Sequence, residues 1–191
     1  MKQYGGQLIS GIKYIHSHCI VHQDLKPLNV LLSEDKGTLK IIDFGVSQKL
    51  DQANHVMQSE IAGTYRYMAL ELHKGSVCLK SDIWAFGCIL LELATGRAVF
   101  DGLNELGLCY KIVKGTTPLD HAKSNGAFKT SLLATNPELL ELVERCLDFD
   151  YQKRPSSTDI FSHPFFQGYT TVVEAEPAQA TVVNRNELPV I

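Results

Sequence analysis

Two short stretches decide the fold and the chemistry expected of this chain: HQDLKPLN at residues 22–29 and DFG at residues 43–45. Between them lie two short apolar runs, residues 30–32 and 39–42, joined by SEDKG, which has the composition of a turn. This pattern predicts a β hairpin. Because a hairpin folds its two ends together, it brings the two polar stretches side by side.

Asn29 and Asp43 stand at the two ends of this predicted hairpin, so we expect them to be near neighbours. An amide oxygen and a carboxylate are hard ligands that suit Mg²⁺, which then holds phosphate oxygens in its remaining positions. Asp24 precedes Asn29 by five positions and can face the same cleft as a proton acceptor. Lys26 can point the same way from an extended loop and neutralise a phosphate. Together these groups fit phosphoryl transfer, in which catalysis is mostly positioning and charge stabilisation.

The pattern His-x-Asp-Leu-Lys-Pro-x-Asn followed by Asp-Phe-Gly resembles the catalytic and metal loops of eukaryotic protein kinases. The resemblance covers roughly residues 1–168. GTYRYMALE at 63–71 is similar to the end of a kinase activation segment, and SDIWAFG at 81–87 to the central helix of the C-terminal lobe. RP at residues 154–155 and HPFF at residues 163–166 are similar to the closing elements of that lobe.

The resemblance implies roles for the residues of the cleft. Asp24 accepts or orients the substrate hydroxyl, and Lys26 contacts the transferred phosphate. Asn29 and Asp43 hold Mg²⁺. Leu31 forms part of the floor beneath the adenine of ATP. Lys26, together with Gly63-Thr64, is typical of the serine/threonine branch, and Thr64 is implied as a partner of both Asp24 and Lys26.

The resemblance also implies a supporting framework. Glu71 and Arg154 form a buried ion pair that anchors the activation segment, and Asp82 braces the catalytic loop from the central helix. His22 is interpreted as structural rather than as a base, and Gly45 as structural support in the metal loop. The implied reaction is transfer of the ATP γ-phosphate to a Ser or Thr hydroxyl of a protein substrate, with ATP and Mg²⁺ as cofactors.

The composition argues against several other classes of protein. The chain has 191 residues, 45% of them hydrophobic and 20% charged, with a net charge of −3. No strong basic field invites nucleic acid or an anionic membrane, and no apolar run reaches the length of a membrane span. Five cysteines, an odd number without a Cys-x-x-Cys pair, argue against a disulfide framework or a zinc site. A reducing intracellular setting, in the cytoplasm, is the prediction.

The chain is predicted to be mainly α-helical, with a protein-kinase-like C-terminal lobe and a small β hairpin at the catalytic cleft. Apolar spacing predicts a helix over 7–19, and Ser81 and Asp82 are expected to open a second helix that Gly96 closes. Asn136-Pro137 and the capping box at Ser156 each begin another helix. Residues 46–67 are expected to form a long loop. Residues 1–168 are assigned to the kinase lobe and residues 169–191 to a disordered tail.

Two departures from the kinase pattern shape the expectation for activity. Gln23 replaces the usual arginine before the catalytic Asp, so switching is not expected to depend on a loop phosphate held at this position. The sequence contains no Gly-rich phosphate loop, no strand lysine for ATP and no helix Glu to partner it. The chain is therefore predicted to be the C-terminal lobe alone, with little turnover by itself. The alternatives are a catalytically silent scaffold or interaction module, and an incomplete part of a longer protein.

Overall fold

The computed structural model describes residues 1–34, 37–51, 55–57 and 63–168. Its helices are α1 (Lys2–Ser17), α2 (Leu70–His73), α3 (Leu79–Thr95), α4 (Glu105–Val113), α5 (Pro118–Ser124), α6 (Pro137–Cys146) and α7 (Ser157–Phe161). Short 3-10 turns are found at Pro27–Asn29, Tyr65–Tyr67, Leu132–Ala134 and Pro164–Phe166. The prediction of a mainly helical fold is confirmed, and the predicted tail lies outside the described residues.

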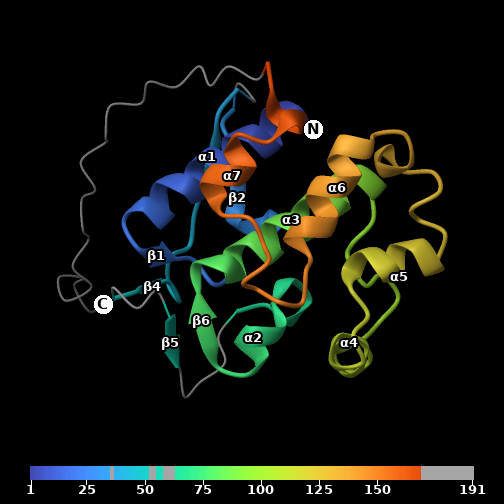
Figure 1. Ribbon diagram of the computed structural model, residues 1–191, viewed down its shortest axis with the longest axis horizontal. Helices are drawn as coiled ribbons and strands as arrows, with labels where there is room; N and C mark the ends of the chain where they lie inside the picture. Colours follow the sequence, from blue (N-terminus) through green and yellow to red (C-terminus); the bar gives the residue numbers. More distant parts are fainter. Residues whose placement is uncertain (35–36, 52–54, 58–62, 169–191) are drawn as a thin grey trace, which may run out of the picture.

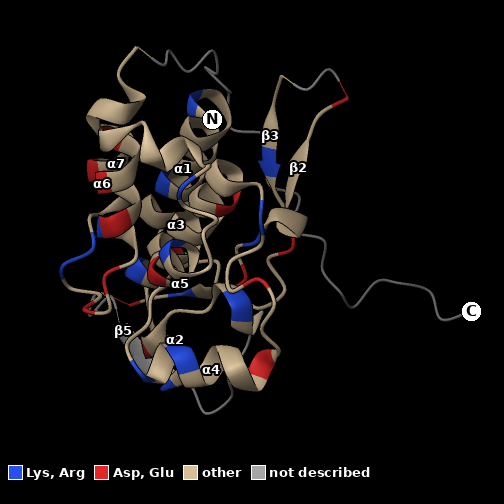
Figure 2. Cartoon of the chain, turned by 90° about the vertical axis from the view of Figure 1, so that its right-hand side faces the viewer, with Lys and Arg blue, Asp and Glu red and all other residues tan. Residues whose placement is uncertain are grey.

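The strands form three small antiparallel pairs. They are β1 (Ile20–Val21) with β4 (Gln48–Lys49), β2 (Val30–Leu32) with β3 (Leu39–Ile41), and β5 (His55–Met57) with β6 (Ser76–Cys78). The β2–β3 pair is the predicted hairpin, in which Val30 lies opposite Ile41 and Leu32 opposite Leu39. Figure 2 shows this hairpin standing beside the helical body, with its ends pointing into the fold.

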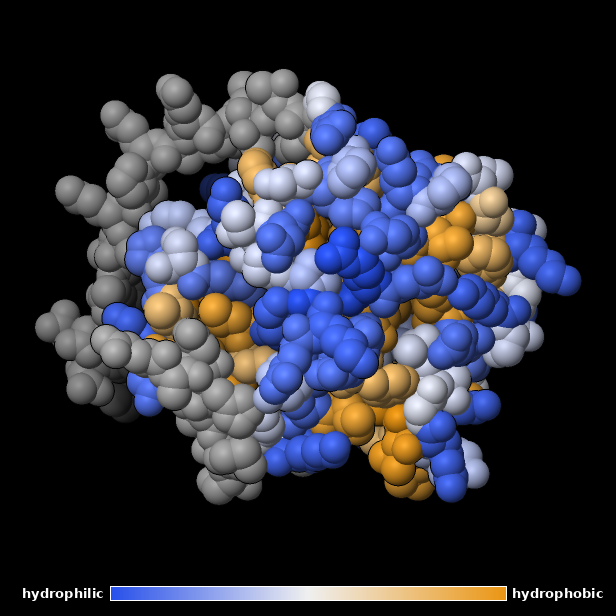
Figure 3. Space-filling view, in the orientation of Figure 1, coloured by the Kyte–Doolittle hydropathy of each residue, from blue (hydrophilic) through white to orange (hydrophobic). Residues whose placement is uncertain are grey.

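Helix α3 runs through the centre of the molecule, between α1, α6 and the loops (Figure 1). Its residues 81–91 are all buried. This confirms the prediction that a helix with apolar residues on every side lies in the interior of the domain. At Gly87 the helix lies so close to α6 that an added Cβ would stand 2.7 Å from the Cβ of Cys146. The helix ends at Gly96, whose φ of 66° is left-handed, as predicted. On the face drawn in Figure 3 the described surface is mostly hydrophilic, with separate apolar patches.

The predicted start of α3 is wrong. Ser81 and Asp82 were expected to open the helix as caps, but the helix begins at Leu79 and Cys78 occupies the cap position without a side-chain hydrogen bond. Ser81 and Asp82 lie in the first turn and are buried, with their side chains bonded to other segments. Their polar groups serve tertiary contacts, which a pattern of local capping residues does not reveal.

Helix α1 is longer than predicted at its N-terminal end, and it stops before Cys19, which has a left-handed φ of 58°. Its buried face contains Leu8, Ile12 and Ile15, as the spacing predicted. The expected loop at 46–67 also holds short structure, namely β4, β5 and the turn Tyr65–Tyr67.

The predicted helix starts at α6 and α7 are confirmed. Asn136 caps α6 by accepting a hydrogen bond from the N–H of Leu139. Ser156 and Asp159 form a complete capping box at α7, each side chain bonding the other's backbone N–H. Cys88 and Cys146 are fully buried among apolar side chains, as predicted, and all five cysteines are free.

Candidate active site

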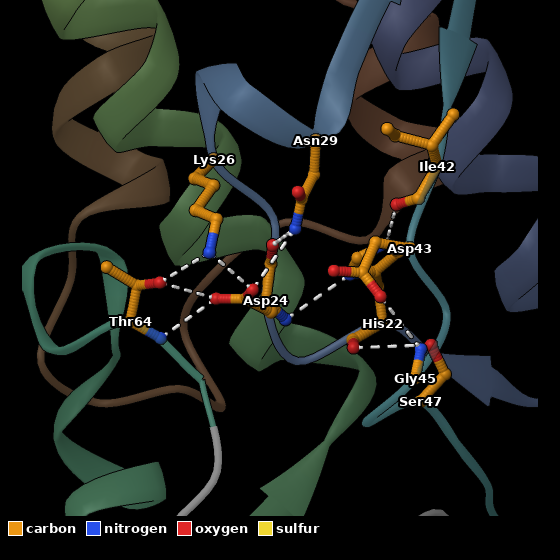
Figure 4. Close-up of polar contacts among 9 residues, drawn as sticks. All are labelled: His22, Asp24, Lys26, Asn29, Ile42, Asp43, Gly45, Ser47 and Thr64. Atoms are coloured by element: carbon orange, nitrogen blue, oxygen red, sulfur yellow. Dashed lines mark hydrogen bonds and ion pairs between the residues drawn. The ribbon is translucent and has the colours of Figure 1, made fainter.

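The carboxylate of Asp24 is the centre of a compact polar network in the loop between β1 and β2 (Figure 4). Its Oδ2 accepts a hydrogen bond of 2.7 Å from Nζ of Lys26. Its Oδ1 accepts two bonds from Thr64, each of 2.8 Å, one from the backbone N–H and one from the hydroxyl. Nζ of Lys26 also donates to the Thr64 hydroxyl over 2.8 Å, so the three side chains close a triangle. The structure therefore brings together all three predicted catalytic residues.

The charge state of Asp24 follows from these contacts. Burial acts to raise the pKa of the Asp24 carboxyl, but the hydrogen bonds from Lys26 and Thr64 and the Lys26 charge outweigh it. The net pKa lies below the ordinary value, so the carboxylate is ionised at neutral pH. An ionised carboxylate can accept a proton or orient a hydroxyl group that approaches it.

Asn29 ties the catalytic loop to the hairpin. Its amide nitrogen donates to the backbone oxygen of Asp24 over 2.8 Å and to the Asp24 carboxylate over 3.1 Å. The backbone oxygen of Asn29 accepts a hydrogen bond of 3.0 Å from the N–H of Ile42. Asp43, the next residue, therefore lies near Asn29 at the open end of the hairpin. The expected proximity of the two polar stretches is found in this arrangement.

Asn29 and Asp43 offer oxygen atoms of the kind that Mg²⁺ prefers. The amide N–H groups of Asn29 are directed at Asp24, which leaves its amide oxygen available as a ligand. The Asp43 carboxylate is exposed and accepts one long bond of 3.3 Å, from the N–H of Gly45. A neutral oxygen and a carboxylate that accepts one long bond from the described residues fit a magnesium ion, whose other ligands would be water and phosphate oxygens.

A single carboxylate beneath the site holds the catalytic loop. Asp82 accepts backbone N–H bonds from His22 over 2.9 Å and from Gln23 over 3.0 Å. The same carboxylate lies 2.9 Å from Nε2 of His16 on α1. Because Asp82 belongs to the central helix, the loop that carries Asp24 is fixed to the most buried element of the fold.

His22 is fully buried and makes two hydrogen bonds of its own. Its Nε2 lies 3.0 Å from the backbone oxygen of Ile42, and its Nδ1 accepts from the N–H of Asp24 over 3.3 Å. The ring of Phe44 packs against it with centroids 4.9 Å apart. These contacts join the catalytic loop to the metal loop and support the structural interpretation of His22.

Two residues of the site have strained backbones. Gln23 and Asp43 have φ values of 68° and 61°, in the left-handed region that residues other than glycine seldom adopt. Such strain persists only where surrounding contacts hold it, and it concentrates at functional sites. The side-chain amide of Gln23 donates to the backbone oxygen of Val46 over 2.8 Å, while its amide oxygen is buried without a hydrogen-bond partner among the described residues.

Glu71 and Arg154 form the buried ion pair that the sequence predicted. Two parallel bonds of 2.6 and 3.0 Å join the guanidinium to the carboxylate. Ser81 donates to the same carboxylate over 3.0 Å, and Arg154 also bonds the backbone oxygens of Lys80 and Asp148. The pair connects α2, at the end of the segment that contains Thr64, to the loop before α7.

Some contacts of the site were not predicted from the sequence. The hydroxyl of Ser47 donates to the backbone oxygen of His22 over 3.3 Å, and Gly63 packs against the backbone oxygen of Gln23. Gly63 was part of the motif at residues 63–71 that resembles the end of an activation segment, but its contact with the Gln23 backbone was not predicted. Leu31, the predicted adenine contact, lies apart from the Asp24 network with half of its side chain exposed on β2.

The protein kinase domain family model matches residues 1–166, the whole of the chain up to the last 3-10 turn. The chain belongs to the protein kinase domain family. Its helical fold with small antiparallel strand pairs fits that family. Residues 22–29 and 43–45, which resemble the catalytic and metal loops of that family, lie inside the matched range.

Several protein kinases are similar to this chain. Serine/threonine-protein kinase Nek9 of Mus musculus is 35% identical over 162 residues, which is 84% of this chain and 15% of that protein. Nek9 of Xenopus laevis is 36% identical over 159 residues, 83% of this chain and 16% of the relative. Mitogen-activated protein kinase 14 of Xenopus laevis is 33% identical over 183 residues, 85% of this chain and 50% of the relative. The chain thus spans about one sixth of the Nek9 proteins.

None of the helices in the described part of this kinase-family chain is both long enough and apolar enough to cross a membrane.

Proposed function

We propose that this chain carries the catalytic loop of a protein serine/threonine kinase, which transfers the γ-phosphate of ATP to a Ser or Thr hydroxyl of a protein. The observation that carries the proposal is the Asp24 carboxylate, held at once by Lys26, Thr64 and Asn29. Phosphoryl transfer demands mostly positioning and charge stabilisation, and this network supplies a positioned acceptor beside a cation. The serine/threonine kinases among the relatives support the substrate class.

Each group of the network has one task in the proposed reaction. Asp24, ionised at neutral pH, orients the substrate hydroxyl and accepts its proton. Lys26 stands 2.7 Å from that carboxylate and neutralises charge on the transferred phosphate. Thr64 holds both side chains in place through its hydroxyl, and its backbone N–H fixes the end of the activation segment against the catalytic loop.

Asn29 and Asp43 are the proposed ligands of Mg²⁺. A bound ion would offset the negative charge of the ATP phosphate groups and so favour the charge distribution of the transfer. Gly45 keeps the turn after Asp43 through its N–H bond to the Asp43 carboxylate. Leu31, with an apolar and half-exposed side chain, is the proposed contact for the adenine.

The proposal includes the assignment of residues 1–168 to the C-terminal lobe of a kinase domain and of residues 169–191 to a tail. The sequence contains no Gly-rich loop or strand lysine for ATP. On and beside the hairpin, Leu31, Leu32 and Phe44 are 50%, 46% and 44% exposed, an unusual concentration of apolar surface next to a polar site. An N-terminal lobe that covers this surface would complete the ATP site. The five free cysteines support a reducing cytoplasmic setting.

The test measures transfer of labelled γ-phosphate from ATP to a generic Ser/Thr-rich protein. The chain is assayed alone and also joined behind the N-terminal lobe of a Nek9 relative. We expect transfer only in the joined form, and a fall of at least about a hundredfold with Asp24→Asn. Asp101→Asn, an exposed carboxylate outside the network, is the matched control.

Two results would count against the proposal. Robust transfer by the chain alone, lost in Asp24→Asn, would keep the kinase function but refute the assignment to a single lobe. A joined, folded protein that binds ATP and transfers no phosphate would favour the catalytically silent scaffold.

A further inference from the structure

A cavity of about 390 Å³ lies between the first half of α1, the β2–β3 hairpin and the C-terminal end of α3. Figure 2 shows the hairpin standing beside α1 in this part of the fold. Most of the lining side chains are apolar, among them Leu8 of α1, Leu32 and Leu39 of the hairpin, and Leu93 of α3. Leu32 and Leu93 are about half exposed, so solvent reaches apolar side chains at the rim. The volume lies within the range of ligand pockets, roughly 300–1,000 Å³, and leaves room for several aliphatic side chains.

Two charged residues, Glu92 and Arg97, line the cavity. Glu92 accepts hydrogen bonds from the hydroxyl of Tyr67 over 3.0 Å and from the backbone N–H of Val99 over 2.8 Å. Arg97 is exposed, and its guanidinium forms no ion pair with a carboxylate of the described residues. A segment with apolar side chains and one adjacent carboxylate therefore complements this surface in both shape and charge.

The cavity lies on the opposite face of the hairpin from the proposed adenine contact. Side chains alternate along a strand, so Val30 and Leu32 share one face of β2 while Leu31 points to the other. Val30 and Leu32 line the cavity, and Leu31 does not. Phe44, which belongs to the apolar surface assigned above to an N-terminal lobe, does not line it either. The cavity is thus a separate surface that shares only Leu32 with the one assigned to that lobe.

The described part of the chain ends beside this cavity. The 3-10 turn Pro164–Phe166 contacts α1, and a Cβ added to Gly5 would lie 3.2 Å from the ring of Phe166. Tyr4, the neighbour of Gly5, lines the cavity. The description ends at Gly168, two positions after Phe166. Residues 169–191 therefore follow from a point close to the cavity.

The last five residues, ELPVI at 187–191, have the complementary chemistry. Three of them are aliphatic, and Glu187 supplies a carboxylate next to them. Pro189 has a fixed φ and disfavours the helical region for Leu188, so less freedom is lost when the segment binds in an extended form. VVEAE at 172–176 also joins apolar and acidic residues, but it has smaller aliphatic side chains and no proline. Residues 187–191 are therefore the better match.

The length of the chain after Gly168 allows this contact. Twenty positions separate Gly168 from Leu188, and a random-coil chain of that length has a root-mean-square end-to-end distance of about 25 Å. Helix α1 spans about 24 Å in all, and the cavity adjoins only its first half. Short linkers hold a tethered segment at an effective concentration in the millimolar range. At about 1 mM, a contact with an intrinsic Kd of about 0.1 mM is occupied roughly nine-tenths of the time.

We propose that residues 187–191 of the same chain bind in this cavity. Leu188 and Ile191 fill the apolar space between α1, the hairpin and α3, and Glu187 pairs with Arg97. Pro27, which lines the cavity, directly follows Lys26, so the bound segment lies beside the catalytic loop. The site uses no proposed catalytic or metal-binding residue, and the inference does not depend on the proposed function.

The test compares two-dimensional ¹H–¹⁵N NMR spectra of the 191-residue chain and its variants. Leu188→Asp would place a charge in an apolar cavity, so it should release the segment and shift the amides of residues 4–8 and 96–98. Val173→Asp, in the other apolar and acidic segment of the tail, is the matched control and should leave these amides in place. Unchanged amides in Leu188→Asp would overturn the proposal, and equal shifts in Val173→Asp would overturn the assignment to residues 187–191.

Two charge variants test the pair at the rim. Arg97→Gln and Glu187→Gln should each weaken the contact about twofold to fivefold, read from the position of the averaged amide shifts. The double variant should lose no more than either single one, because both changes remove the same pair. Arg145→Gln, at an exposed arginine of α6 outside the cavity, is the control. Additive losses in the double variant would overturn the contact between Glu187 and Arg97.

Protein concentration separates binding within one chain from binding between copies. Amide positions that stay constant over a wide range of concentration support the intrachain contact, because its effective concentration is fixed by the linker. Shifts of the cavity amides that grow with protein concentration would identify a second copy as the occupant and overturn the intrachain assignment.

Discussion

The backbone N–H of Gln23 donates a hydrogen bond of 3.0 Å to the carboxylate of Asp82, which lies 59 positions later in the chain. The preceding N–H, that of His22, donates to the other oxygen of the same carboxylate. A buried helix residue thereby fixes two consecutive peptide groups immediately before Asp24. The left-handed backbone of Gln23 is held by this contact.

Asp82→Asn should loosen the catalytic loop. The amide would present its own donor to one of the two N–H groups, which would be left buried without an acceptor, at a cost of about 1–3 kcal/mol. Urea unfolding should show this loss, and the amides of His22 and Gln23 should exchange faster with deuterium. Asp101→Asn is the control, and unchanged exchange at both amides would contradict the proposed brace.

Acid should weaken the fold partly through Asp24. Its pKa lies below the ordinary 3.8, so the unfolded chain takes up this proton first as the pH falls. The stabilisation is complete above about pH 5 and is lost as the pH falls below 3.8 through the folded-state pKa. Lys26→Met removes a donor and a charge that lower this pKa.

Lys26→Met should therefore raise the pKa of Asp24 in a carbon-13 NMR titration. The variant should also lose less stability than the parent between pH 6 and pH 3. Lys40→Met, at an exposed position of β3, should leave both quantities unchanged. A lower Asp24 pKa in Lys26→Met would refute the assigned cause.

Arg154→Leu should be strongly destabilising. It leaves the Glu71 carboxylate buried without its guanidinium partner, and breaking such a pair costs about 3–5 kcal/mol. Arg145→Leu breaks an exposed pair with Glu141, which is worth about 0.5 kcal/mol or less. Urea unfolding of both variants measures the difference. Similar losses in the two would mean that the buried pair contributes no more than a surface one.

Gly63→Ala should displace the end of the activation segment. Gly63 has a φ of 107°, and an added Cβ would lie 2.6 Å from the backbone oxygen of Gln23. Left-handed strain and this clash together should cost about 1–3 kcal/mol and shift the amide resonance of Thr64. Gly126→Ala shares a positive φ of 83° but meets no atom within 4 Å, so it measures the strain alone. Equal effects would show that no clash exists.

The hairpin and most of the Asp24 network could be predicted because the residues that form them are close together in the sequence. Turn residues between two apolar runs define the β2–β3 pair, and Asp24, Lys26 and Asn29 lie within six positions of each other. Thr64 was added by the family resemblance, since no local pattern joins it to a residue 40 positions away. Its bonds to Asp24 confirm the expected contact, while the catalytic roles remain predictions.

Other features depend on partners that are distant in the sequence. Strand β4 has two residues and pairs with β1, so no alternation was present to mark it within residues 46–67. The local pattern indicated only a helix start at Asp82, whereas the family resemblance implied that Asp82 braces the catalytic loop, and its bonds from the N–H groups of His22 and Gln23 agree with the resemblance. Gln23 and Asp43 have left-handed backbones, but neither is a glycine, so the sequence did not indicate this conformation.

The Glu71–Arg154 pair also bears on how the chain is synthesised. Its partners are separated by 83 positions, and ribosomes add about 5–20 residues each second. Glu71 is therefore made roughly 4 to 17 s before Arg154 exists. During that interval the Glu71 carboxylate lacks the guanidinium partner that it has in the folded structure. The contact between Glu71 and Arg154 therefore cannot form until the chain has been synthesised past residue 154.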